Sequence, residues 1–154
     1  MNLAPRVQGV VHSQQKCHNR SMLEITLAYN EKNDLVRILE AIKDSCDSQL
    51  FYWFFLSIYS NMTLLESDSN VANIAQRIND RLFFSWEEVQ KIGCTDNLQE
   101  CELIAFETEQ NAQNFKDSGQ ITGFILFLSM ADYRTWKINS PNEQLLNTIT
   151  HNLA

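Results

Sequence analysis

The ten residues from Leu50 to Tyr59 constrain the fold more than any other stretch of this chain. Nine of them are large apolar or aromatic residues, and none is charged. Burying one such side chain stabilises a folded protein by roughly 1.5–3 kcal/mol, so this stretch must lie inside the fold. It is too short to cross a bilayer, which takes about 20 apolar residues. We therefore expect it to form a buried core element.

Periodicity alone does not decide whether this core element is a helix or a strand, because a continuous apolar run fits both. Ser48 is placed to cap a helix, and the helical spacing of apolar residues continues to Leu65. The chain has only four Gly and two Pro, which limits the number of tight turns that a large sheet needs. These features favour a helix over residues 50–59.

Further helices are predicted by apolar residues at steps of three and four and by residues that cap helix ends. The sequence Ser85-Trp86-Glu87-Glu88 is a capping box, and Gly93 suits the end of the short helix that follows. The sequence Ser140-Pro141-Asn142-Glu143 resembles a second capping box ahead of a closing helix. Other helices are expected at 34–46, at 71–82 and, as one long helix, from residue 95 or 96 to about 119.

The predicted fold is therefore an all-α bundle of about six or seven helices around a central aromatic-rich helix. Residues 21–29 are ambiguous, because Ser21–Glu24 fits a capping box while Leu23–Tyr29 alternates as a strand does. We favour the helix there. The alternative is an α+β fold with a small sheet, whose strands would be Leu23–Tyr29, Leu50–Tyr59, Glu102–Glu107 and Ile121–Met130.

The chain divides into a flexible basic N-terminal arm, residues 1–20, and a single globular domain, residues 21–154. The arm has a charge of +3, no acidic residue and no periodicity beyond a short strand expected at Val7–Val11. The remainder carries −10, and its length suits one domain. No apolar segment near the N-terminus resembles a signal peptide, so a cytoplasmic protein with reduced cysteines is expected.

The sequence contains no recognisable catalytic motif. It lacks a phosphate-binding glycine loop, a dinucleotide fingerprint, a nucleophile elbow and a zincin helix. Cys17-His18 is the only adjacent pair of soft metal ligands, whereas a zinc site commonly uses four. Cys94 or Cys101 would need a neighbouring base to act as a nucleophile. We therefore expect no catalytic residue, no metal, no cofactor and no enzymatic activity.

The segment from Glu87 to Glu109 is the candidate functional region, because it carries seven acidic residues and only Lys91 as a base. On a helix, Leu103 and Phe106 would lie between these acids and outside the apolar stripe. Apolar anchors surrounded by carboxylates are typical of a binding site for a basic partner. The predicted partner-binding residues are Glu87, Glu88, Asp96, Glu100, Glu102, Leu103, Phe106, Glu107 and Glu109.

The expected function is that of a small acidic binding protein that masks a basic surface of a protein partner. An immunity protein or antitoxin that inhibits a nuclease-like toxin fits this combination of size and charge. Basic residues do not cluster, so binding to nucleic acid is not expected, and neither is binding to a membrane. One alternative is an adaptor or secretion chaperone that binds an amphipathic segment, and another is a small enzyme that uses an isolated Cys or Glu.

Overall fold

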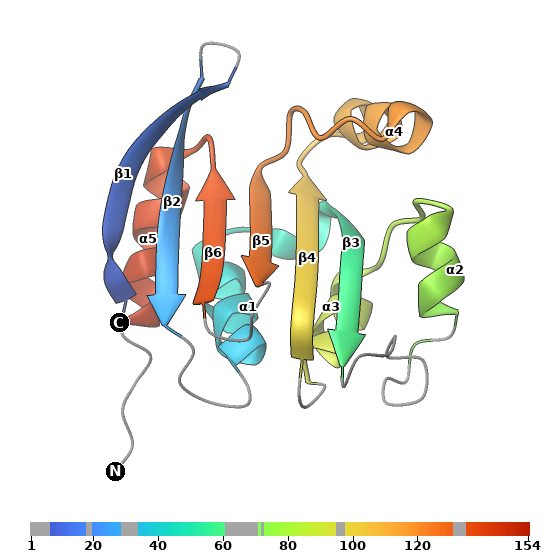
Figure 1. Ribbon diagram of the computed structural model, residues 1–154, viewed down its shortest axis with the longest axis horizontal. Helices are drawn as coiled ribbons and strands as arrows, with labels where there is room; N and C mark the ends of the chain where they lie inside the picture. The colour runs from blue at the N-terminus through green and yellow to red at the C-terminus, as the bar shows by residue number, and fades with distance from the viewer. Residues whose placement is uncertain are drawn as a thin grey trace.

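A computed structural model describes residues 7–17, 20–28, 34–60, 71, 73–94, 98–130 and 135–154. In these residues, six strands form one antiparallel sheet with the order β1-β2-β6-β5-β4-β3 (Figure 1). The strands are β1 (Val7–Cys17), β2 (Arg20–Ala28), β3 (Tyr52–Ser60), β4 (Leu98–Phe106), β5 (Leu126–Met130) and β6 (Thr135–Ser140). The helices are α1 (Asp34–Ser45), α2 (Ile74–Asn79), α3 (Trp86–Gly93), α4 (Glu109–Ser118) and α5 (Glu143–Leu153), with a 3-10 helix, η1 (Ser48–Leu50).

The first two strands of the chain form one edge of the sheet, and the next strand, β3, forms the opposite edge. The β1–β2 hairpin forms the first edge, and α1 crosses behind the sheet to β3 at the opposite edge (Figure 1). From β3 the chain returns through β4 and β5 to β6, which pairs with β2. Most of the predicted N-terminal arm thus lies in β1, which includes the short strand expected at Val7–Val11.

The fold is α+β, and the predicted all-α bundle is wrong. The aromatic run from Leu50 to Tyr59 is buried as expected, but most of it forms the edge strand β3. Alternation in residues 23–29 also indicated the correct structure, because that stretch lies mainly in β2. Each of the four strands of the α+β alternative overlaps an observed strand, whereas β6 was not predicted.

The predicted long helix over residues 96–119 is also wrong, because it divides into β4 and α4. Thr108 caps α4 by accepting a hydrogen bond from the backbone N–H of Asn111 at 3.2 Å. A helix was predicted for β4 because the upper part of this strand is buried on both faces of the sheet. Leu103 and Ile104 point to opposite faces of the sheet, and both are fully buried. A strand buried on both faces shows no apolar–polar alternation, so its sequence resembles that of a buried helix.

The helix α3 confirms the capping box predicted from sequence. The Ser85 hydroxyl accepts from the backbone N–H of Glu88, and the Glu88 carboxylate accepts from that of Ser85. The closing helix α5 is also present, but it begins at Glu143 and is capped by Asn142. Ser140, the cap expected from the sequence, instead ends β6.

The first face of the sheet holds the main core, and α1, α3 and α5 cover it (Figure 1). Every strand from β3 to β6 contributes a side chain to this core that is almost completely buried, among them Trp53, Leu103, Leu128 and Ile138. The Trp53 indole is fixed in place because its Nε1–H donates a hydrogen bond of 2.8 Å to the backbone carbonyl of Ser48.

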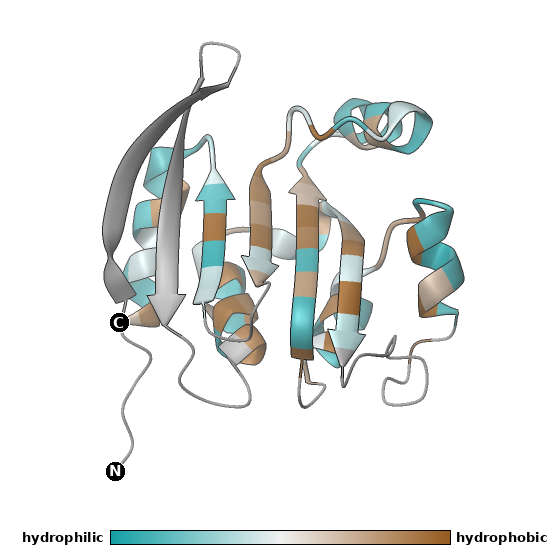
Figure 2. Ribbon diagram, viewed as in Figure 1, coloured by the Kyte–Doolittle hydropathy of each residue, from teal (hydrophilic) through white to brown (hydrophobic). Residues whose placement is uncertain are grey.

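Among the described elements, only α4 covers the second face, at its upper end over β3 and β4. Here Phe54, Ile104 and Phe106 pack against Ala112 and Phe115 of α4. Figure 2 shows that α4 is otherwise largely hydrophilic, and these two are its only buried residues. Below α4, no described element covers this face (Figure 1). The side chains that β3–β6 present there are therefore the candidates for a binding surface.

Phe115 is predicted to hold α4 on the sheet, because its ring lies 4.9 Å from that of Phe54 and 5.5 Å from that of Phe106. Phe115→Ala should lower the free energy of unfolding by about 3–4 kcal/mol, measured by urea denaturation. The exposed Gln113 on the same helix is the control, and Gln113→Ala should change it by less than about 0.5 kcal/mol. Equal effects of the two substitutions would contradict this anchoring role.

Candidate functional site

The two apolar anchors predicted from sequence lie inside the protein. Leu103 and Phe106 are both fully buried, Leu103 in the main core and Phe106 beneath α4. The predicted arrangement, with these two side chains exposed between carboxylates, is therefore wrong. It assumed a helix, whereas in the strand β4 successive side chains point to opposite faces of the sheet.

The described acidic residues of the predicted site are distributed over three parts of the structure. Glu87 and Glu88 lie in the first turn of α3, Glu100 and Glu102 lie on β4, and Glu107 and Glu109 lie where β4 leads into α4. Asp96 lies outside the described residues. Only Glu100 and Glu102 share one strand and one face.

Glu88 has a structural role that accounts for its position. Its carboxylate accepts two hydrogen bonds from the Arg77 guanidinium, at 2.5 and 2.9 Å, besides closing the capping box. The same guanidinium lies 4.1 Å from the centre of the Phe84 ring. The salt bridge between Arg77 and Glu88 therefore joins α2 to α3. These hydrogen bonds, chiefly those from Arg77, lower the pKa of Glu88 to about 2. Glu88 is thus committed to holding α2 and α3 together.

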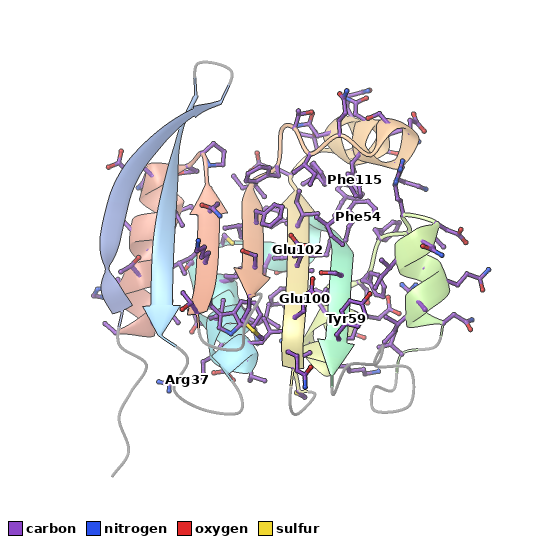
Figure 3. All side chains as sticks on the ribbon, viewed as in Figure 1. Arg37, Phe54, Tyr59, Glu100, Glu102 and Phe115 are labelled. Atoms are coloured by element: carbon purple, nitrogen blue, oxygen red, sulfur yellow. The ribbon has the colours of Figure 1, made fainter. Side chains whose placement is uncertain are left out.

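Glu100 and Glu102 lie on the lower half of the second face, where α4 does not reach (Figure 3). Their direction follows from the pleat, because Cys101 and Leu103 on either side of Glu102 point into the main core. Glu102 accepts a hydrogen bond of 3.2 Å from the Ser57 hydroxyl on β3. No salt bridge joins Glu100 or Glu102 to another residue whose side chain is described.

A polar row crosses the sheet at the level of Glu102. Glu102 pairs directly with Ser57 of β3 on one side and with Ser129 of β5 on the other, and Ser129 pairs with Lys137 of β6. Lys137 is exposed on this face, because its neighbours Trp136 and Ile138 are buried in the main core. The row thus carries a carboxylate and an ammonium group separated by one serine.

Aromatic side chains border these polar groups along β3. Tyr59, 38% exposed, pairs directly with Glu100, and Figure 3 shows the two lying side by side. Farther up β3, Tyr52 makes an edge-to-face contact with Phe83, with 6.0 Å between the ring centres, and Phe83 is 53% exposed.

We use the term open face for the lower part of the second face, which no described element covers. It consists of Ser57, Tyr59, Glu100, Glu102, Ser129 and Lys137.

Two thiols, those of Cys101 and Cys46, are not activated as nucleophiles. Burial raises the pKa of the Cys101 thiol far above its ordinary value. Burial, with Asp47 and Glu107 nearby, raises the pKa of the Cys46 thiol to about 11. Both thiols are therefore protonated at neutral pH, and a protonated thiol is a weak nucleophile. Cys94 is exposed.

Across the residues with described side chains, no three His, Cys, Asp or Glu residues gather as a metal site would require. Cys17 lies in β1, and its sequence neighbour His18 falls outside the described residues. The open face therefore offers groups that bind by charge, hydrogen bonding and aromatic contact.

No helix among the described residues has the length and apolar character needed to cross a membrane.

Comparison with known proteins gives no match to this chain. No family model matches it, and neither do the curated proteins or the solved structures.

The sequence did contain a signal for the open face, which the helical interpretation hid. Glu100 and Glu102 alternate with Cys101 and Leu103, which is the pattern of a strand with one polar face. Lys137 alternates in the same way with the buried residues of β6. What the sequence could not indicate is that β4 and β6 lie on either side of β5, which brings these charges onto one face.

The Glu88–Arg77 contact predicts a defined dependence of stability on pH. The folded-state pKa of Glu88 is lowered from 4.5 to about 2, so its contribution is complete above pH 4.5 and disappears as the pH falls towards 2. Glu88→Gln retains a capping side chain but removes the charge. It should lower the free energy of unfolding at pH 7 by about 1 kcal/mol, because the pair is only partly buried and water weakens the attraction between the two charges.

The measurement is urea denaturation of the wild type and Glu88→Gln between pH 7 and pH 2. The difference between the two proteins should shrink as the pH falls below 4.5. Glu87→Gln, at the exposed neighbouring position, should show no comparable convergence. A constant difference across the whole pH range would mean that the charge of Glu88 does not stabilise the fold.

Proposed function

We propose that this protein is a non-enzymatic binding protein whose open face masks a basic surface of a protein partner. The observation that carries the proposal is the position of Glu100 and Glu102. Both carboxylates lie on a part of the sheet that no described element covers, and no cation among the described side chains forms a salt bridge with either. Such carboxylates attract the Lys and Arg side chains of a partner and accept charge-assisted hydrogen bonds from them.

The aromatic residues of β3 supply the apolar contacts that such a surface needs. Tyr and Trp are enriched among the residues that dominate binding energy, because a large ring and a polar group occur in one side chain. Tyr59 lies directly beside Glu100, so its ring adjoins a carboxylate. Phe83 and Tyr52 extend the apolar border upwards, towards α4. These residues take the place of Leu103 and Phe106 in the proposed surface.

The kind of partner is proposed from charge and from the form of the site. The chain has a net charge of −7, which favours association with cationic proteins over binding to nucleic acid. A sheet face with carboxylates and rings suits occlusion of another protein's surface. An immunity protein or antitoxin that acts in the cytoplasm on a nuclease-like toxin would work in this way, because blocking a basic active-site surface requires no chemistry.

The proposal predicts that partner capture depends on the charge of β4. Immobilised wild-type protein, incubated with extract of the source cells, should retain a basic protein, identified by mass spectrometry. The double variant Glu100→Lys/Glu102→Lys should lose at least about tenfold in affinity for that protein, because two favourable charge contacts become repulsive. Binding of the wild type should also weaken with increasing salt concentration.

The control is the double variant Glu40→Lys/Asp44→Lys on α1. Both residues are exposed, and α1 packs on the first face of the sheet, so the change in net charge is identical but lies away from the open face. This variant should keep its affinity to within about threefold. An equal loss in both variants would mean that only net charge matters. Retention of an acidic partner, or capture unaffected by the β4 variant, would refute the proposal.

A further inference from the structure

The polar row across the open face carries both signs of charge in a fixed order. The pairs Ser57–Glu102, Glu102–Ser129 and Ser129–Lys137 place one residue from each of four adjacent strands at the same level. Neighbouring strands lie about 4.8 Å apart, so the Glu102 and Lys137 backbones are separated by about 10 Å. Ser129 between them carries no charge.

The two charged groups of this row, Glu102 towards one end and Lys137 towards the other, have few partners among the described residues. Lys137 is exposed, and no salt bridge links it to any described side chain. Glu102 has only the hydroxyl of Ser57 as a described partner, which leaves most of the carboxylate's hydrogen-bonding capacity unused. Glu100, two residues along β4, adds a second negative charge at the same end.

The part of the sheet above the row limits where a ligand can lie. The next level consists of Phe54, Ile104, Phe127 and Asn139, again by direct pairing. At this level α4 closes the face over β3 and β4, where Phe54 and Ile104 are buried against it. A ligand that contacts both ends of the polar row must therefore cross the strands below α4.

We infer that the open face recognises a partner segment carrying a basic and an acidic side chain about 10 Å apart, oriented across the strands. The basic side chain lies over Glu100 and Glu102, and the acidic one lies over Lys137. This inference rests on the proposed function and adds to it a requirement for the partner's charge pattern. A segment with basic residues at both positions would meet repulsion at Lys137, so the ammonium group selects among cationic partners.

Three capped tetrapeptides test this charge pattern directly. In acetyl-Lys-Gly-Gly-Glu-amide the Cα atoms of the two charged residues lie about 10 Å apart when the chain is near full length, and the two flexible glycines let both side chains turn towards one face. The Lys-Gly-Gly-Lys and Glu-Gly-Gly-Glu counterparts have the same spacing and carry like charges. Each is titrated at millimolar concentration into ¹⁵N-labelled protein at low salt, and binding is followed by amide shifts in β4, β5 and β6. The wild type should bind the mixed-charge peptide about two- to fivefold more tightly than the Lys-only peptide.

Charge reversal should change the order of preference in a defined way. Lys137→Glu makes both ends of the row negative and should favour the Lys-only peptide. Glu100→Lys/Glu102→Lys makes both ends positive and should favour the Glu-only peptide. The variant that combines all three reversals restores opposite charges and should again prefer the mixed peptide, which can bind in the reverse direction. Lys43→Glu, an exposed position on α1, is the control and should keep the wild-type order.

The outcomes separate this inference from the proposed function. Equal binding of the mixed and Lys-only peptides by the wild type, or an order unchanged by Lys137→Glu, would overturn the charge pattern alone. Absence of any shift at the open face would also overturn it, while partner capture that depends on Glu100 and Glu102 would still support the proposed function. Amide shifts at the open face on simple dilution of the protein would identify a second copy as the occupant and overturn the peptide assignment.

Discussion

The alternation of side chains along β4 is the constraint on which the rest of this structure depends. β4 pairs with β3 and β5, and its Cys101, Leu103 and Ala105 side chains form part of the main core beneath the helices. The intervening side chains must therefore point to the second face. On that face the apolar side chains, Ile104 and Phe106, must be buried, whereas the carboxylates of Glu100 and Glu102 must stay hydrated. One strand therefore determines both the apolar cluster beneath α4 and the open face.

The position of α4 defines the boundary between these two regions. The helix has little apolar surface, and its attachment depends on Phe115, whose ring contacts both Phe54 and Phe106. Two further contacts fix its C-terminal end. The Arg81 guanidinium donates to the backbone carbonyl of Lys116 at 3.1 Å and also packs against Gly119. Gly119 has a φ of +73°, which other residues adopt only with strain. The open face begins where this attachment ends.

The sequence predicted local features better than the pairing of distant segments. The capping box at Ser85 and Glu88 was correct, because each contact joins residues three positions apart. The aromatic run at 50–59 was correctly placed in the core, but its strand conformation depends on pairing with residues 100–106, more than forty positions away in the sequence. Propensity and periodicity carry no information about such pairing, and strand formation depends on it more than helix formation does.

The candidate site shows the same limit. Its acidic residues were all named, yet the choice among them required the sheet, which separated Glu87 and Glu88 from Glu100 and Glu102. Lys137 was not considered, because β6 was not predicted and the residue lies far from the acidic segment in sequence. Leu103 and Phe106 were misassigned for one reason, since the helical spacing that placed them outward does not apply to a strand.

The charges of the open face are arranged differently from those of a face that only maintains solubility. Solubility is served by interspersed charges of both signs, whereas Glu100 and Glu102 lie two positions apart on one strand and repel each other. Glu is also unfavourable in strands, so this arrangement reduces the stability of the sheet. A partner's Lys or Arg would relieve that repulsion, and Lys137, two strands away, would remain to accept an acidic group. The unfavourable placement of the two carboxylates is thus a physical reason for the proposed binding role of this face.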